Sequence, residues 1–409
     1  MPSARGEWLK NESAPAEDWQ GNMAEAYIVE ALRTAGGRRN GRLSGWHPAD
    51  LGGFILDAIV DRTGIDPAAV EDVIMGCVSQ VGEQADSLGR NAVFASKLPI
   101  SVPAVTIDRQ CGSSQQAIHF AAQAVMAGVQ DVVIAAGAES MSRVKMGSPR
   151  NYEHEVSPYS PKILDRFGVN GFSQFVGAER IAAKWGLTRE MLDAFGLESH
   201  RRAQAATREG AFAREIVPVP ITLADGSSDL HVQDEGIRWD ASPEGMAAVK
   251  LFDEAGTITA ATSSQITDGA SAVMVASEQA LKDHELTPLA RILNMTVSGG
   301  DPIMWLEEPL FATDKAVKRA GMTIGEIDLY EVNEAFAPIP MAWMKHVGAD
   351  AAKLNVNGGA IALGHPLGAS GTKLMATLIH ALRARGGRYG LQTMCEGGAL
   401  ANVTIIEAL

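Results

Sequence analysis

One stretch constrains the fold of this chain more than any other: a short apolar run ends at a cysteine and passes directly into a helical pattern. The stretch reads IDRQCGSS at 107–114, and apolar residues then recur at helical spacing until Gly128. A second apolar run, rich in β-branched residues, follows at 131–137. Strand, helix and strand in this order form a βαβ unit with buried parallel strands. The chain is therefore predicted to be an α/β protein.

The C-terminal part of the chain shows a similar succession of elements. A helical pattern is expected at 335–347, and a glycine-rich turn at 357–371 opens a second helix. The expected strands are 327–332, 353–356, 389–394 and 403–406. Each part presents a strand, a sharp turn with a reactive residue, a helix and a strand. Two similar α/β halves packed together are predicted, although residue identity between them is too low to prove a duplication.

The remaining segments complete the predicted organisation. The fold is expected to begin near Met23, with a strand at 26–31, a helix at 51–60 and a buried strand at 73–78 that carries Cys77 in a packing role. Prolines interrupt the pattern between 142 and 264, which indicates an inserted loop domain. The predicted divisions are a disordered arm at 1–22, an N-terminal half at 23–141 plus 265–285, the loop domain at 142–264, and a C-terminal half at 286–409.

Composition limits the function classes. The 409 residues are 46% hydrophobic and carry a formal net charge of −14, which argues against nucleic-acid partners but allows a local basic site for an anionic ligand. Three scattered cysteines are too few for a disulfide framework or a metal site, so we expect no bound metal and a reducing cytoplasm. No apolar leader or membrane-length apolar stretch is present, so we expect no membrane partner.

Cys111 is the first candidate for chemistry. A helix N-terminus has unpaired backbone N–H groups and the positive end of the helix dipole, which stabilise a thiolate. We therefore expect the pKa of the Cys111 thiol to fall and the residue to act as a nucleophile. The alternative is a structural cysteine, because buried cysteines are common. Only partners elsewhere in the chain can decide between the two interpretations.

Four other stretches could carry chemistry, and each has a structural alternative. His365, between a glycine and a proline, is either a catalytic base or a helix cap. Asn333 follows a strand, where a polar residue often caps a helix. Cys395 could be a buried thiol beside a tight turn, and 262–270 could be a polar turn before a strand. The glycine-rich run matches neither a P-loop nor a dinucleotide-binding fingerprint, which argues against nucleotide hydrolysis and hydride transfer.

Taken together, these stretches resemble the thiolase family, and the resemblance spans the chain from Met23. The matching motifs occur in the family's order and read RQCGSS at 109–114, NEAF at 333–336, GHPLG at 364–368 and CEGG at 395–398. The resemblance implies a five-layered α/β/α/β/α fold of two similar halves with an inserted loop domain. This agrees with the elements predicted from the residues.

The resemblance also implies a division of catalytic work. His365 would activate Cys111, which would carry the acyl group, and Cys395 would exchange a proton at the α-carbon of the acetyl unit. One oxyanion site would use His365 with a water held by Asn333. The other would use the backbone N–H groups of Cys111 and Gly397.

Coenzyme A and acyl-CoA are implied as substrates, with no permanently bound cofactor. In the loop-domain stretch the resemblance assigns CoA contacts to Arg238, Phe252 and Ser264, and it places Ala335 and Phe336 along the channel. An arginine suits phosphate or adenine, although Arg238 could equally be a solvated surface charge. The family further implies a homodimer or a homotetramer.

Departures from the family pattern bear on the substrate. Asp108 and Ala399 stand where asparagine and glycine are frequent, and Ser173-Gln174 stands where biosynthetic acetoacetyl-CoA thiolases carry His-Met. Neither Asp108 nor Ala399 removes a reacting group, whereas Ser173-Gln174 favours a degradative enzyme that cleaves 3-ketoacyl-CoA with CoA to acetyl-CoA and a shortened acyl-CoA. One alternative is an acetyl-CoA C-acetyltransferase that forms acetoacetyl-CoA. The other is a catalytically silent thiolase-like protein that binds acyl-CoA.

Overall fold

The computed structural model describes residues 24–150 and 157–409. The predicted arm at 1–22 lies outside the described residues. Among the described residues, no helix combines the length and the apolar character needed to cross a membrane.

The N-terminal half is built on a five-stranded sheet in the order β1-β8-β5-β3-β4. Its strands are β1 (Ala26–Arg33), β3 (Asp72–Gly76), β4 (Ala104–Ile107), β5 (Val132–Ser140) and β8 (Thr267–Ser277), with the short β2 (Gly37–Arg38) beside β8. β4 and β5 run parallel to β3 on either side of it, and helix α3 (Ser113–Met126) connects them. The βαβ unit predicted around Cys111 is therefore confirmed.

The C-terminal half has a sheet in the order β10-β11-β12-β9. Its strands are β9 (Ala290–Gly299), β10 (Leu329–Val332), β11 (Tyr389–Glu396) and β12 (Leu400–Ala408). β10 and β11 are parallel, whereas β12 is antiparallel to both of its neighbours. The two sheets meet at one short antiparallel contact between β1 and β9, where Tyr27 and Ile28 pair with Arg291 and Ala290.

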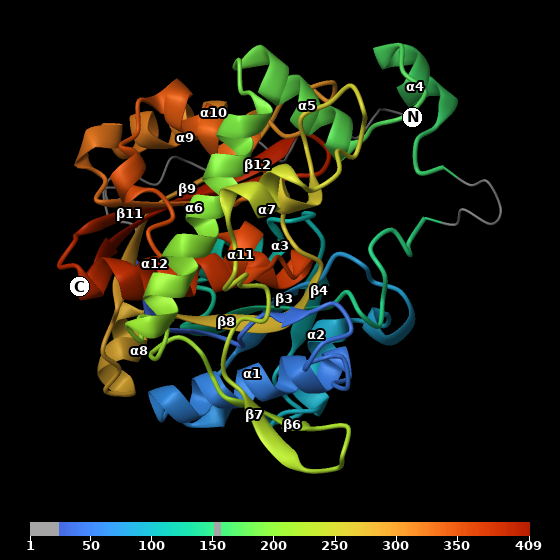
Figure 1. The fold of residues 1–409 in the computed structure, drawn as a ribbon. Coiled ribbons are helices and arrows are strands. Elements are labelled where there is room, and N and C mark those ends of the chain that lie inside the picture. Colours follow the sequence, from blue (N-terminus) through green and yellow to red (C-terminus); the bar gives the residue numbers. More distant parts are fainter. Residues whose placement is uncertain (1–23, 151–156) are drawn as a thin grey trace, which may run out of the picture.

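Helices fill three layers around these two sheets, as Figure 1 shows. The layers are formed by α1 (Pro48–Thr63) with α2 (Leu88–Phe94), by α3 with α12 (Ser370–Ala384), and by α9 (Glu308–Ala320) with α10 (Pro338–Val347). One apolar cluster joins the first layer to the N-terminal sheet, and another joins the third layer to the C-terminal sheet. The cluster around α3 and α12 contacts both sheets. The predicted five-layered fold is confirmed.

The segment between β5 and β8 forms a separate group of elements over one side of the sheets (Figure 1). Its elements are α4 (Pro161–Phe167), α5 (Gln174–Lys184), α6 (Arg189–Arg208), β6 (Val219–Thr222), β7 (Ser228–His231) and α7 (Pro243–Ala247). The short helices α8 (Glu278–Asp283) and α11 (Ala360–Leu363) lie in the two halves. A buried ion cluster ties this segment to β1, because Arg33 pairs with Glu215 at 2.6 Å and with Asp234 at 2.8 Å.

Two details differ from the sequence prediction. The expected strand at 353–356 is wrong: a 3-10 helix, Ala351–Lys353, occupies its start, and only Leu354 makes a bridge to Tyr330. Asp350 caps this helical turn by accepting a hydrogen bond from the Ala352 N–H, a local contact that overrides the short apolar run. Cys77 lies just after β3 rather than within it, and it is fully buried.

Candidate active site

Cys111 lies on the tight turn between β4 and α3. Gln110 has a positive φ of 50°, and the Ser113 hydroxyl donates to the Gln110 carbonyl at 2.6 Å and accepts from the Arg109 N–H at 2.9 Å. These contacts turn the chain sharply after the strand and place Cys111 beside the start of the helix. The backbone N–H groups of Cys111 itself and of Gly397 face its sulfur. The thiol therefore lies where two amide donors converge.

The expected fall in the pKa of Cys111 is wrong for the free protein. Burial raises the pKa of the Cys111 thiol to about 12, and the nearby Glu396 carboxylate raises it further, whereas the two N–H groups lower it. Desolvation disfavours a thiolate more strongly than one helix terminus stabilises it. The resting residue is a neutral thiol, so a nearby base is needed to activate it.

His365 follows α11 in a turn that is fixed from several sides. Gly364 has a φ of 81°, and a Cβ at this position would lie 2.3 Å from the Thr267 hydroxyl. That hydroxyl accepts a hydrogen bond from the His365 N–H at 3.0 Å. Lys373 of α12 donates from its Nζ to the carbonyls of Leu363 and Gly364. The histidine backbone is thus held against β8 and α12.

The hydrogen bonds around the imidazole define its tautomer. The Ser370 hydroxyl donates its one hydrogen to the Pro366 carbonyl at 2.8 Å, so it must accept from His365 Nδ1, 2.5 Å away. Nδ1 therefore carries the proton, and Nε2 presents a lone pair, 3.4 Å from the Asn333 Nδ2. Burial and the Lys373 charge lower the pKa of His365 to about 3, so the ring is neutral. A neutral imidazole with a free Nε2 is suited to accept a proton.

Asn333 and Cys395 come from the ends of two neighbouring parallel strands. Asn333 directly follows β10, and its buried Oδ1 has no hydrogen-bond partner among the described residues, so it can accept one from a polar group. Cys395 lies near the end of β11 and is 1% exposed. Burial raises the pKa of its thiol well above the ordinary value, and an ionised Cys111 raises it further. The two sulfurs therefore lie within electrostatic reach of each other.

The turn from β11 to β12 brings Gly397 against the Cys111 turn. A Cβ on Gly397 would lie 3.0 Å from the Gln110 side-chain oxygen, and Gly398 has a φ of 91°. Ala399, where the family often has glycine, also has a positive φ, 57°. The left-handed conformation that glycine favours is therefore kept at 399 despite the substitution.

A cavity of about 1080 Å³ opens onto Cys111 and His365. All five residues predicted to contact CoA line it, namely Arg238, Phe252, Ser264, Ala335 and Phe336. The structure thus brings together residues from both halves and from the segment between β5 and β8. Asn333 and Cys395 do not line the cavity. The Asn333 Nδ2 lies 3.4 Å from the His365 Nε2, and Cys395 lies close to Cys111.

Four further residues support the site, and no role was predicted for any of them from the sequence. Ser370 and Thr267 orient His365, Lys373 holds the preceding turn, and the buried Glu396 carboxyl lies next to Gly112. Thr267 and Glu396 lie within the stretches 262–270 and 395–398 singled out above, and Ser370 and Lys373 follow His365 closely on the first turn of α12. In the part of the chain that the structure describes, no group of three or more His, Cys, Asp or Glu residues is arranged to hold a metal ion.

Comparison with known proteins agrees with this geometry. The model of the thiolase N-terminal domain matches residues 26–279, and that of the thiolase C-terminal domain matches residues 286–408. A steroid 3-ketoacyl-CoA thiolase of Mycobacterium tuberculosis is 51% identical over 392 residues, 95% of either chain. A 3-ketoacyl-CoA thiolase of Marinobacter nauticus is 40% identical over 395 residues, 95% of this chain and 99% of the relative.

A solved structure gives the same result. The crystal structure of human mitochondrial 3-ketoacyl-CoA thiolase superimposes with a TM-score of 0.85 at 36% identity, covering 95% of this chain and all of that chain. The domain models and these relatives span both sheets and every residue of the candidate site. The chain belongs to the thiolase family.

Proposed function

We propose that this protein is an acyltransferase that cleaves 3-ketoacyl-CoA with CoA, giving acetyl-CoA and an acyl-CoA shortened by two carbons. The observation that carries the proposal is the arrangement of Cys111 and His365 on the wall of the large cavity. There a neutral thiol at Cys111 faces two amide donors beside a neutral imidazole with an unprotonated Nε2. The names of the relatives support the same reaction.

The first half-reaction forms an acyl-enzyme. His365 Nε2 takes the Cys111 proton, and the thiolate attacks the 3-keto carbon of the substrate. The N–H groups of Cys111 and Gly397 stabilise the resulting alkoxide. When the alkoxide collapses, the C2–C3 bond breaks and leaves the enolate of acetyl-CoA. Protonated His365 and Asn333 stabilise this enolate, and Cys395 donates the proton to C2. Acetyl-CoA departs, and the acyl group remains on Cys111.

The second half-reaction returns every proton. The Cys395 thiolate takes the proton of an incoming CoA thiol, and the CoA thiolate attacks the acyl thioester. The tetrahedral intermediate collapses with Cys111 as the leaving group, and His365 returns its proton to that sulfur. The enzyme is restored without a metal or a redox step. CoA takes part only as a substrate, and the proposed mechanism uses no permanently bound cofactor.

The wall of the cavity supports CoA as the substrate. Arg38, Arg39 and Arg238 lie along it, and their charges suit the phosphates of an anionic nucleotide. Phe252 and Phe336 offer apolar surface for the pantetheine arm and the acyl group. We propose that residues 142–264 act as a CoA-binding domain, because this segment contributes Arg238, Phe252 and Ser264 to the wall.

We also propose a homodimer or a homotetramer in the cytoplasm. β4 is the edge strand of the N-terminal sheet in the described residues, and Phe94, Ile100 and Val105 are exposed beside it. An open strand edge with apolar neighbours is suited to pair with a second copy. Light scattering on the purified protein measures the assembly directly, and a monomer at micromolar concentration would contradict the proposal.

Two experiments test the function. Thiolysis of acetoacetyl-CoA and longer 3-ketoacyl-CoA esters should require free CoA and should be lost in Cys111→Ala. Activity confined to acetoacetyl-CoA would favour the alternative enzyme that forms acetoacetyl-CoA. Mass spectrometry after brief exposure to acetyl-CoA should find an acetyl group on Cys111. A protein that binds acyl-CoA but shows neither turnover nor the adduct would be the catalytically silent relative.

A further inference from the structure

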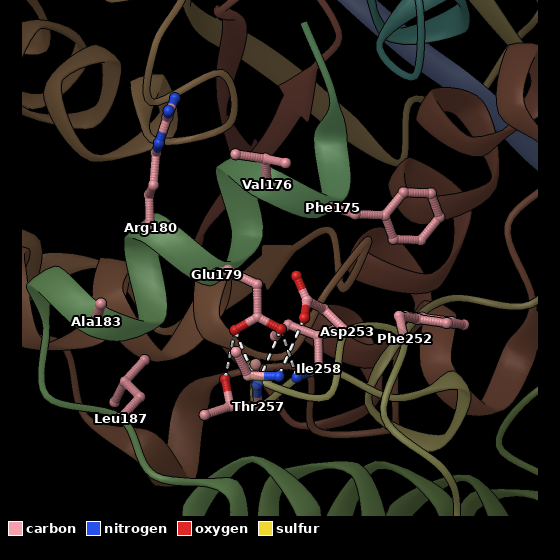
Figure 2. A pocket seen from close by; sticks show the side chains of 12 residues that line it. Phe175, Val176, Glu179, Arg180, Ala183, Leu187, Phe252, Asp253, Thr257 and Ile258 are labelled. Carbon is pink, nitrogen blue, oxygen red and sulfur yellow. Dashed lines mark hydrogen bonds between the residues drawn. The ribbon is translucent and has the colours of Figure 1, made fainter.

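A second pocket of about 680 Å³ lies between α5 and the loop that follows α7. Figure 2 shows Phe175 and Phe252 at one end of this side pocket and Ala183 and Leu187 at the other. Its apolar wall is completed by Val176 and Ile258. None of the residues assigned to acyl transfer lines it.

Hydrogen bonds fix the shape of the side pocket. The Glu179 carboxylate accepts from the N–H groups of Thr257 and Ile258 at 2.9 and 2.8 Å and from the Thr257 hydroxyl at 2.9 Å (Figure 2). Gly256 is required in this loop, because a Cβ there would lie 2.2 Å from a Glu179 oxygen. The Glu179 carboxylate thus holds the loop that contains Thr257 and Ile258 against α5, and this contact fixes one wall of the side pocket.

The side pocket adjoins the reaction cavity. Phe175 and Phe252 line both. The Phe175 ring packs edge-on against Phe252, with centroids 5.0 Å apart, and against Phe336 at 5.5 Å. Because Phe336 also lines the reaction cavity, an aromatic wall runs from that cavity into the side pocket.

The net charge of the lining residues is negative in the side pocket and positive in the reaction cavity. The side pocket has the carboxylates of Glu179 and Asp253 against the single cation Arg180, whose guanidinium donates to the Ile303 carbonyl at 2.6 Å. The reaction cavity instead carries the three arginines described above against Glu235 and Asp240. The anionic nucleotide of CoA is therefore favoured in the reaction cavity and disfavoured in the side pocket.

We infer that the side pocket binds the apolar end of the 3-ketoacyl group, the part remote from the thioester. This inference rests on the proposed thiolase function and deepens it, because it makes the side pocket the determinant of acyl size. A long aliphatic chain or an alicyclic group would pass Phe175 and bury its hydrocarbon against Val176, Ala183 and Leu187. An acetoacetyl group has only a methyl group beyond its keto carbon and so has no hydrocarbon chain to place there.

The test uses substitutions that narrow the side pocket and leave the lining of the reaction cavity unchanged. Ala183→Trp and Val176→Trp each place an indole on α5 in the side pocket, at positions that do not line the reaction cavity. Ala205→Trp on α6, an exposed position that lines neither space, is the matched control. The kcat/KM of each variant is measured with acetoacetyl-CoA and with the better substrate of 3-ketodecanoyl-CoA and a cyclohexyl-bearing 3-ketoacyl-CoA.

Both side-pocket variants should lose about tenfold or more in kcat/KM for the larger substrate, the effect of a misfitting group in an apolar pocket. Acetoacetyl-CoA thiolysis should stay within about twofold, which also shows that the variants fold. An unchanged ratio between the two substrates in both variants, or an equal change in Ala205→Trp, overturns the subsite. Wild-type protein that cleaves no 3-ketoacyl-CoA overturns the proposed function instead, so the two failures are distinguishable.

Discussion

Cys77 and Cys111 follow neighbouring parallel strands of the same sheet, yet only one of them is placed for chemistry. Cys77 directly follows β3, and Cys111 lies shortly after the end of β4. The two strand ends are joined by a hydrogen bond from the Cys77 N–H to the Ile107 carbonyl. Burial raises the pKa of both thiols. Cys77 is enclosed beside the Glu139 carboxylate, whereas Cys111 opens onto the cavity that His365 also lines.

This difference shows that a strand end and a helix terminus do not by themselves make a nucleophile. What separates Cys111 from Cys77 is a place on the cavity wall, two converging N–H groups and a neutral imidazole on the same cavity. A high resting pKa is compatible with catalysis when a base removes the proton during the reaction.

The largest predicted effect separates these two cysteines. Cys111→Ala should lower the kcat of thiolysis by about ten-thousandfold or more, because no group remains to carry the acyl unit. Cys77→Ala is the matched control, and its kcat should stay within about twofold while the free energy of unfolding falls by about 1 kcal/mol for the small cavity. Steady-state kinetics and urea unfolding measure both. A comparable loss of activity in Cys77→Ala would remove the distinction.

The next effect concerns the second thiol of the site. Cys395→Ala should lower thiolysis about a thousandfold, because the enolate loses its proton donor. Acetylation of Cys111 by acetyl-CoA should be slowed much less, since a CoA thiolate can leave before it is protonated, whereas carbon–carbon cleavage produces an enolate that needs a proton donor. Kinetics and mass spectrometry of one preparation separate the two steps. Loss of acetylation in this variant would show that Cys395 is needed to shape the Cys111 turn and is not a proton donor alone.

Asn333→Ala should have an intermediate effect. It removes the amide that lies 3.4 Å from His365 Nε2, and we expect kcat to fall about a hundredfold, as for other single oxyanion donors. The KM for the 3-ketoacyl-CoA should change little, because the contact of Asn333 with the thioester oxygen strengthens only as negative charge develops on that oxygen in the transition state. A rise in KM with unchanged kcat would instead assign Asn333 to substrate binding.

The smallest effect is a pH dependence that tests the resting state of Cys111. Because the thiolate is the reactive form and the pKa is raised to about 12, alkylation by iodoacetamide should rise about tenfold per pH unit from neutral to alkaline pH. Cys111→Ala supplies the background rate. A plateau near neutral pH would show that the helix terminus and His365 already hold a thiolate in the free enzyme.

The sequence was sufficient for the parts of the fold with strong local patterns. The βαβ unit around Cys111 and the helix after the glycine-rich turn follow from hydrophobic period and turn residues, and both occur in the structure. The strand expected at 353–356 failed because a side-chain cap and a single bridge, neither visible in the apolar pattern, decide that segment. The pairing of β8 between β1 and β5 joins distant segments, which local patterns do not reveal.

The candidate site divides in the same way. The motif residues that line or adjoin the cavity could be chosen from the sequence, and their roles stay predictions. The tautomer of His365 depends on Ser370, and the high pKa of Cys111 depends on burial and on Glu396, more than 280 positions away. Burial is a property of the packed protein, so a rule about helix termini alone gave the wrong direction for that pKa.

The strand that joins the two parts of the C-terminal sheet, β12, comes after the other described strands along the chain. β12 lies between β11 and β9, and the turn that precedes it carries the Gly397 N–H that faces Cys111. The nucleophile therefore leaves the ribosome long before His365 and well before its second amide donor. A chain that has completed only the N-terminal sheet lacks both the His365 imidazole and the Gly397 N–H, so the site around Cys111 is assembled only when the C-terminal sheet has formed.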